Sequence, residues 1–237
     1  MVSCTLCGGS SFDEREILWP ELIEEWDLLP HEVQYINRQQ GMLCACGANL
    51  RIIALSNAIR SALSTEMLIR DLAKEPWARE LQILDLNGAS ALSEMLAKLP
   101  GYTRGDYPLV DMLDLPFQSG RFDLVIHSDT LEHVSDPIAG LGECRRVLTA
   151  SGRLCFTVPI VVGRLTRDRK GLPKSYHGNP ETGADDYAVH TEFGSDAWTY
   201  PLKAGFSDVA LNAVDFPSAI AITAWTAIPA AVTPQAR

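Results

Sequence analysis

Residues 127–133, with the sequence HSDTLEH, gather hydroxyl, carboxyl and imidazole groups in a short stretch where a plain connector would need none. Histidine is the side chain best suited to take a proton near neutral pH, so His133 is a candidate base. Ser128 and Asp129 are candidate ligand contacts in the same stretch. An equally good interpretation is structural, with Glu132 and His133 holding the loop in place.

The elements around this stretch predict where it must lie. Residues 122–126 are apolar and β-branched without alternation, which indicates a strand buried on both faces. Asp136 and Pro137 are typical of a helix start, and residues 154–158 form a second apolar run. A strand–helix–strand unit of this length implies parallel strands joined by a right-handed crossover. Ligands of such sheets bind beyond the carboxyl ends of the strands, which here is the polar stretch.

The order and spacing of these residues are similar to a known family. FDLVIHSDTLEHVSDP, followed by RVL and a strand that ends in VP, resembles the later half of a class I S-adenosylmethionine (SAM)-dependent methyltransferase of the type 11 kind. Residues 81–159 carry most of the resemblance. It implies an α/β fold with a Rossmann-like doubly wound sheet, and SAM as the cofactor that donates a methyl group.

The resemblance also implies contacts to the methionine part of SAM. Residues 81–90 match the first strand and its loop, where Asp85 would handle the ammonium group and the backbone at Asn87 and Gly88 would approach the ligand. The family usually has two glycines in this loop, whereas Gly88 is the single one here. Ser128 and Asp129 would lie beside the cofactor at the end of a later strand.

Two further acids match positions that hold the nucleoside of SAM. By resemblance, Asp106 accepts hydrogen bonds from the ribose hydroxyls, and Asp111 accepts one from the adenine amino group. The backbone N–H of Met112 would face the adenine ring. The helix that usually separates these two segments is missing or reduced to a turn. The alternative for Asp111 is an acidic surface loop, and Asp85 competes with Asp106 for the ribose.

Four of the six cysteines form two close pairs near the N-terminus. They are Cys4 and Cys7, followed by Cys44 and Cys46. Four thiolates can close a tetrahedral zinc site, and the pattern resembles a zinc ribbon with C-x-C in place of the usual second C-x-x-C. We expect a structural zinc ion, since four cysteines leave no open position for catalysis. The alternatives are a substitute ligand at His31, a disulfide, or cysteines of no joint role.

The segment at residues 163–192 is too long and too rich in glycine, proline and charge for a simple connector. Such loops at the carboxyl edge usually build a substrate pocket, and this one loosely resembles methyltransferases of glycan and natural-product pathways. His177 and His190 are its candidate bases, and the alternative for each is a hydrogen-bonded loop histidine. Its basic stretch at residues 164–174 is either a solvated loop, which we prefer, or an anion site.

These patterns divide the 237 residues into four parts. They are a zinc-binding segment at 1–50, connecting helices at 51–78, a methyltransferase domain at 79–230 and a tail at 231–237. Within the first part, residues 17–35 are aromatic and acidic, and we expect them to pack on the cysteine segment rather than line a substrate entrance. The net charge of −10 disfavours nucleic acid as a partner. No membrane span or secretory signal is evident, so a cytoplasmic location is the default.

The sequence therefore predicts transfer of a methyl group from SAM to a hydroxyl, or an amine, of a small molecule or glycan. One alternative is an N- or C-methyltransferase that acts on another acceptor, including protein. The other is a catalytically inactive, zinc-dependent binding or scaffold protein, which the unusual loop at Asn87 and Gly88 keeps open. A dinucleotide oxidoreductase is disfavoured because no G-x-G-x-x-G follows the first strand. The oligomeric state stays open.

Overall fold

A computed structural model describes residues 2–176 and 187–226 of the chain. His177 and the expected tail at 231–237 therefore lie outside the described residues. Within the described ranges, no helix has the length and apolar character that a membrane crossing needs.

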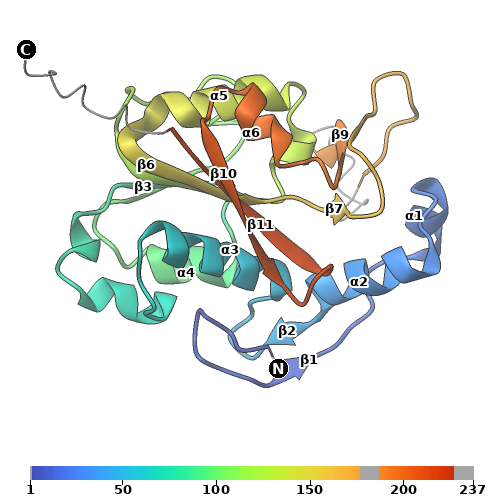
Figure 1. The fold of residues 1–237 in the computed structure, drawn as a ribbon, viewed down its shortest axis with the longest axis horizontal. Coiled ribbons are helices and arrows are strands. Elements are labelled where there is room, and N and C mark those ends of the chain that lie inside the picture. The colour runs from blue at the N-terminus through green and yellow to red at the C-terminus, as the bar shows by residue number, and fades with distance from the viewer. Residues whose placement is uncertain (1, 177–186, 227–237) are drawn as a thin grey trace, which may run out of the picture.

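A six-stranded sheet forms the centre of the molecule (Figure 1). In spatial order its strands are β10 (Asp208–Val214), β11 (Ala219–Trp225), β6 (Leu148–Thr157), β5 (Phe122–Ser128), β3 (Ile83–Leu86) and β4 (Tyr102–Gly105). The strands β6, β5, β3 and β4 run parallel, so their carboxyl ends meet at one edge. β11 pairs antiparallel with β6, and β10 pairs antiparallel with β11, so an antiparallel hairpin forms this edge of the sheet.

Helices cover both faces of this sheet (Figure 1). α3 (Leu50–Ala62) and α4 (Ala91–Leu96) lie on one face, and α5 (Pro137–Val147) and α6 (Thr199–Lys203) lie on the other. Alternate residues of one strand enter different cores: Ile83 packs with α3 and α4, whereas Leu84 packs with α5. The predicted doubly wound α/β sheet is thus confirmed, and the continuous apolar runs of its strands follow from burial on both faces.

Local sequence explains where the main helices start. The Asn49 side chain accepts a hydrogen bond of 2.9 Å from Ile52 N at the start of α3, and Asp136 accepts one of 3.0 Å from Ala139 N at the start of α5. The expected connecting helices at 51–78 are α3 followed by two short 3₁₀ helices, η1 (Ile69–Lys74) and η2 (Ala78–Glu80). Between β4 and β5 the described chain holds no helix, as the sequence suggests.

The N-terminal part is continuous with the methyltransferase-like body. A two-stranded sheet of β1 (Phe12–Asp13) and β2 (Leu43–Cys44) brackets two helices, α1 (Pro20–Glu25) and α2 (Pro30–Gly41). Cys4, Leu6 and Cys44 are buried in the same apolar core as α3. The expected zinc-binding segment is therefore packed onto the large domain rather than held beside it.

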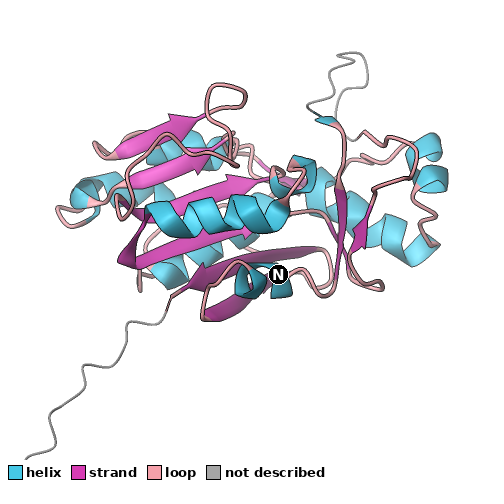
Figure 2. Ribbon diagram, turned by 90° about the horizontal axis from the view of Figure 1, so that it is seen from above, coloured by secondary structure: helices cyan, strands magenta, loops and turns pink. Residues whose placement is uncertain are grey.

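A second, small sheet stands beyond one end of the central sheet, next to α1 and α2 (Figure 2). It has the order β7 (Ile160–Val161), β9 (Thr191–Gly194), β8 (Arg167–Asp168). β8 and the first half of β9 belong to the long segment at 163–192, which the sequence assigns to a substrate pocket. The chain reaches it directly from the carboxyl end of β6, so the small sheet extends the edge at which ligands of such folds bind.

Candidate functional site

A cavity of about 780 Å³ opens at the carboxyl edge of the parallel strands, and we term it the donor cavity. It lies between β3 and β5, which are followed by helices on opposite faces of the sheet. This is the usual ligand position in open α/β sheets. Its wall contains the following predicted contacts and bases: Asn87, Gly88, Asp106, Asp111, Met112, Ser128, Asp129, His133 and His190. The structure thus brings together residues from four separate loops, as the strand order requires.

Asp85 is the exception, because its side chain turns away from the donor cavity. It is fully buried on the α4 side of β3, where it accepts hydrogen bonds from Ser93 Oγ and, at 2.7 Å, from the Tyr102 hydroxyl. Burial raises the pKa of Asp85 above its ordinary value, although the two hydroxyl donors oppose the shift. The sequence-based role as a direct contact to the SAM ammonium is therefore corrected: Asp85 supports the loop from below.

The loop after β3 is held in an uncommon backbone conformation. Asn87 and Gly88 have φ of +63° and +75°, and a Cβ atom on Gly88 would come within 2.7 Å of the Arg104 guanidinium. The Asn87 side chain accepts a hydrogen bond of 2.8 Å from Tyr107 N. One glycine is therefore enough here, because Asn87 tolerates the left-handed region and ties the loop to the next one.

The two acids expected at the nucleoside are both at the wall of the donor cavity. Arg104 Nε donates to the Asp106 carboxylate at 2.8 and 3.0 Å, and Asp111 Oδ1 accepts from Leu113 N at 2.9 Å. Sequence reasoning missed Arg104. Its spacing of two from Asp106 on an extended chain was the available signal, since alternate residues of a strand share one face.

A charged cluster, in which Arg51 and Glu132 are buried and the Asp129 side chain is 40% exposed, supports the end of β5, and sequence reasoning missed its cation. Arg51, on α3, is buried and pairs with Asp129, which has φ of +52°. Burial raises the pKa of the neighbouring Glu132 well above its ordinary value. The one sequence signal for this pairing was an arginine among apolar neighbours in the first turn of the helix.

His133 lies at the end of η3 (Leu131–His133), and its environment keeps it neutral. Burial lowers the pKa of His133, while the hydrogen bond to Ala188 and the charge of Asp129 act in the opposite direction. The Nδ1 atom lies 3.1 Å from the Ala188 carbonyl oxygen. Because that oxygen can only accept, Nδ1 carries the proton and the proton-accepting lone pair is on Nε2.

The other two described histidines near this edge are placed differently. His190 is exposed, lines the donor cavity and directly precedes β9 in the chain. His127 is fully buried and stacks on Phe156 with 4.8 Å between ring centroids, and burial lowers its pKa to about 3. His127 is therefore a neutral core residue, whereas His133 and His190 face the site.

A second cavity of about 420 Å³ adjoins the first, and we term it the apolar cavity. Asp129, His133 and Tyr187 line both cavities, so the two meet at these side chains. Trp19 and Trp26 form part of its wall. The aromatic segment at 17–35 therefore lines the apolar cavity and packs on the small sheet, which corrects the preferred expectation that it packs on the cysteine segment.

The four N-terminal cysteines converge on one point. Their Sγ atoms all lie within 4.8 Å of one another, with 3.6 Å between Cys4 and Cys46 and 3.6 Å between Cys7 and Cys44. A zinc tetrahedron with Zn–S bonds of about 2.3 Å has edges of about 3.8 Å, whereas a disulfide needs about 2.05 Å. The arrangement fits a metal ion, and it does not fit a disulfide. His31 is not part of the cluster, so the alternative of a histidine ligand is not supported.

The sheet order, the helices on both faces and the cavity at the carboxyl edge define the Rossmann-like α/β fold of the class I methyltransferases. Residues 75–156 match the family described as a methyltransferase domain, Methyltransf_11. The central part of the chain is therefore a methyltransferase domain, and the sequence-based resemblance to this class is confirmed.

One curated relative is the ubiquinone biosynthesis O-methyltransferase of Cereibacter sphaeroides. It is 30% identical over 113 residues, which are 38% of this chain and 46% of the relative. The match thus spans about half the length of the relative. Among solved structures, the CurJ carbon methyltransferase has a TM-score of 0.44 at 14% identity, covering 88% of this chain and 70% of its own. The trans-methyltransferase CalH, in complex with SAH, has a TM-score of 0.42 at 15% identity, covering 83% and 67%.

Proposed function

We propose that this protein transfers a methyl group from SAM, bound in the donor cavity, to a hydroxyl of a small molecule bound in the apolar cavity. The observation that carries the proposal is the junction of the two cavities at Asp129, His133 and Tyr187. A methyl transfer needs donor and acceptor to meet in line, and the enzyme contributes mainly by aligning them. Two adjoining cavities with a shared polar wall suit that task.

The residues of the donor cavity fit SAM in size and chemistry. Its volume of about 780 Å³ is within the range of cofactor sites. Asp106 and Asp111 offer carboxylate oxygens to a diol and an amino group, and the Gly88 backbone permits close approach to the ligand. When bound, SAM supplies an electrophilic methyl carbon on a sulfonium; the bond from the acceptor oxygen to that carbon forms as the carbon–sulfur pair returns to sulfur.

The proton of the acceptor hydroxyl must leave during this transfer, and we assign its acceptance to His133. Its lowered pKa keeps the imidazole neutral, and Nε2 is the atom able to take the proton. His190 lines the donor cavity but not the apolar cavity, which makes it the weaker candidate for the base. The groups around His133 are Asp129, Glu132, His190 and the ring of Tyr187.

Replacing His133 with alanine is expected to lower turnover about a hundredfold or more, with little change in SAM affinity. The pH profile is the second readout: wild-type turnover should persist below the ordinary histidine pKa and fall only as pH drops through the lowered value. His190→Ala is the matched control and should leave this acid limb in place. Unchanged turnover in His133→Ala would indicate an acceptor, such as a neutral amine, that needs no base.

Replacing Asp111 with alanine is expected to weaken SAM binding about tenfold, the equivalent of one hydrogen bond. The Asp111→Asn variant keeps one acceptor oxygen, which Leu113 N or the ligand can use, so it should lose less affinity than Asp111→Ala. Isothermal titration calorimetry with SAM measures both. Equal affinity of Asp111→Ala and the wild type would remove Asp111 from the adenine site, and no heat with the wild type would favour a scaffold function.

We also infer that the four-cysteine cluster holds a structural zinc ion. Sulfur–sulfur distances of 3.6 Å match a tetrahedral thiolate site, and the Gly9 backbone N–H donates to Cys7 Sγ at 3.4 Å, as expected near a thiolate. None of its four cysteines lines the donor cavity, although Asn49, three positions after Cys46, does. The role of the cluster is therefore in folding rather than in the transfer itself.

A further inference from the structure

We propose that the methyl acceptor is an uncharged, mostly apolar and flat small molecule with its hydroxyl at one end. This inference rests on the proposed methyl transfer and adds the class of substrate to it. It narrows the sequence-based expectation of a small molecule or glycan to the first of the two. The argument comes from the wall of the apolar cavity and from what holds that wall in place.

Aromatic and aliphatic side chains make most of this wall. Trp19, Leu22 and Trp26 come from the α1 region, Ile36 comes from α2, and Val161 comes from β7 on the opposite side. No lysine or arginine lines the cavity in the described parts of the chain. A site without a cation does not compensate the desolvation of a phosphate or carboxylate, so an anionic acceptor is disfavoured.

Three of the polar side chains of the cavity, those of Asp129, His133 and Tyr187, also line the donor cavity and therefore lie where the two cavities meet. Gln40 is the remaining polar residue of the wall. A ligand that fits this pattern places its apolar body among the tryptophans and its polar end at the donor. A sugar chain carries hydroxyls along its whole length, and most of them would lie against apolar wall without hydrogen-bond partners.

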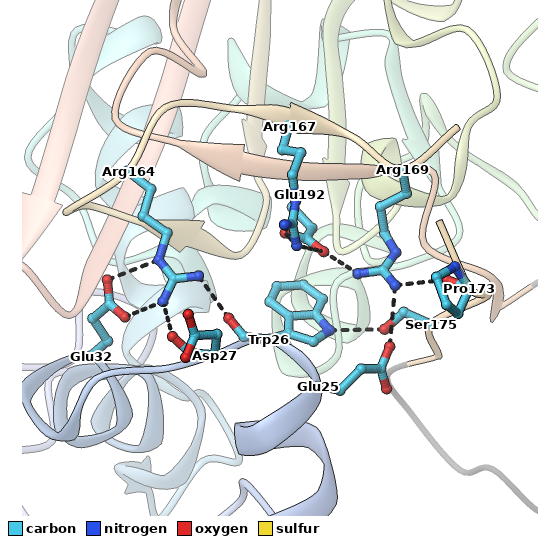
Figure 3. A network of polar contacts seen from close by, with 10 residues as sticks. All are labelled: Glu25, Trp26, Asp27, Glu32, Arg164, Arg167, Arg169, Pro173, Ser175 and Glu192. Carbon is cyan, nitrogen blue, oxygen red and sulfur yellow. Dashed lines mark hydrogen bonds and ion pairs between the residues drawn. The ribbon is translucent and has the colours of Figure 1, made fainter. Parts of the chain in front are cut away.

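The basic stretch of the small sheet does not supply an anion site, because its arginines are already engaged (Figure 3). Arg167 and Arg169 both donate to Glu192, with 2.9 Å from Arg167 Nε to Glu192 Oε2. Arg164 bonds to the Glu32 carboxylate and, at 2.7 Å, to the Trp26 carbonyl oxygen. The expectation of a plain solvated loop is corrected too, since these side chains form a bonded network.

The same network fixes the roof of the cavity, which we define as residues 17–36. The Trp26 indole Nε1 donates to Ser175 Oγ at 2.8 Å, and Arg169 pairs with Glu25 (Figure 3). The Tyr35 hydroxyl accepts from Val162 N at 2.9 Å. The roof is therefore attached to the small sheet at several points, and the apolar cavity is preformed rather than dependent on a ligand to assemble it.

The first experiment measures binding of neutral phenols to the full-length protein by calorimetry, in the presence of S-adenosylhomocysteine. The probes are phenol, naphthol and hydroxybiphenyl, with methyl glucoside and phenyl phosphate for comparison. We expect affinity to rise about tenfold with each added ring, because burial of apolar surface drives the binding. Tighter binding of methyl glucoside or phenyl phosphate than of naphthol would overturn the inference.

The second experiment places a charge in the wall. Ile17 lines the cavity and is 37% exposed, whereas Leu29 belongs to the same roof, is 52% exposed and does not line it. Ile17→Asp should weaken naphthol binding about tenfold or more, and Leu29→Asp should leave it unchanged. An equal effect of both variants, or naphthol binding that neither alters, would overturn the inference.

SAM binding by the same variants separates the two proposals. If SAM binds and no phenol does, the substrate class is wrong and the proposed methyl transfer stands. If SAM itself fails to bind the wild-type protein, the proposed function fails first. Transfer of a radiolabelled methyl group from SAM to hydroxybiphenyl, reduced in Ile17→Asp and retained in Leu29→Asp, would support both.

Discussion

A Cys44→Ser variant will lose about one equivalent of zinc and most of its folding stability. Structural zinc contributes about 10–16 kcal/mol of apparent binding free energy in zinc-finger peptides, which matches or exceeds the whole stability of about 5–15 kcal/mol of a typical domain. Cys44 is 3% exposed and packs in the core that contains α3, so loss of the ion would also loosen the large domain.

Metal analysis of the purified protein and thermal unfolding measure this result together. Cys144→Ala is the matched control, because Cys144 is equally buried but lies on α5, outside the four-sulfur cluster. This variant should keep its zinc. Its stability should fall only by the small amount expected when a buried side chain is shortened and leaves a cavity. Wild-type protein that contains no metal after purification under reducing conditions would sink the zinc inference.

An Arg164→Met variant will lose about 3 kcal/mol of stability and much of its acceptor binding, while SAM affinity stays near the wild-type value. The side chain of Glu32 is 2% exposed, and that of Arg164 is 30% exposed. Removing the arginine leaves a buried carboxylate that still accepts a hydrogen bond of 2.9 Å from the Leu29 N–H. The expected loss of stability is at the low end of what removal of one partner from a buried ion pair usually costs, because water reaches part of Arg164.

Two further variants separate the pair from general charge effects. Glu32→Gln combined with Arg164→Met removes both charges and should recover part of the lost stability, since no buried charge is left behind. Arg145→Met removes an exposed arginine of α5 and should change stability by less than about 0.5 kcal/mol. Denaturant unfolding measures all three. A loss in Arg164→Met no larger than in Arg145→Met would mean that the pair does not hold the roof.

Low pH should weaken the ion pair between Glu32 and Arg164 that attaches the roof to the small sheet. Burial pushes the pKa of Glu32 upward, but hydrogen bonds from Arg164 and Leu29 and the arginine charge outweigh it, so the net pKa lies below its ordinary value. A carboxyl whose pKa is lowered by folding stabilises the protein above its unfolded pKa of about 4.3, and the contribution is lost as pH falls through the folded value. Wild-type stability should therefore fall more steeply below that pH than the stability of Glu32→Gln.

The sequence predicted the sheet and the donor cavity well for a physical reason. Buried parallel strands read as continuous apolar runs, and the strand order brings the residues after each carboxyl end to one edge. Gly88, Asp106, Asp111 and Asp129 were therefore predictable as neighbours even though the loops are far apart in the chain.

The misses concern the direction of a side chain or a contact over a long distance in the chain. Asp85 is next to the right loop, but strand alternation turns it toward α4. Arg51 pairs with Asp129 across 78 positions, which no local pattern encodes. The roof pairs with the small sheet in the same way, through Arg164 and Glu32 at a separation of 132 positions.

The N-terminal chain connects the proposed zinc site to the roof of the apolar cavity. Cys7 and Cys44 are 37 positions apart, and their Sγ atoms lie 3.6 Å from each other. The intervening chain, which contains the roof, is therefore a loop whose two ends meet at the cysteine cluster. Fixing the two ends of a loop restricts the conformations that its middle can adopt. Removal of the zinc ion by a chelator should therefore increase the mobility of the roof over the acceptor as well as lower the stability of the large domain.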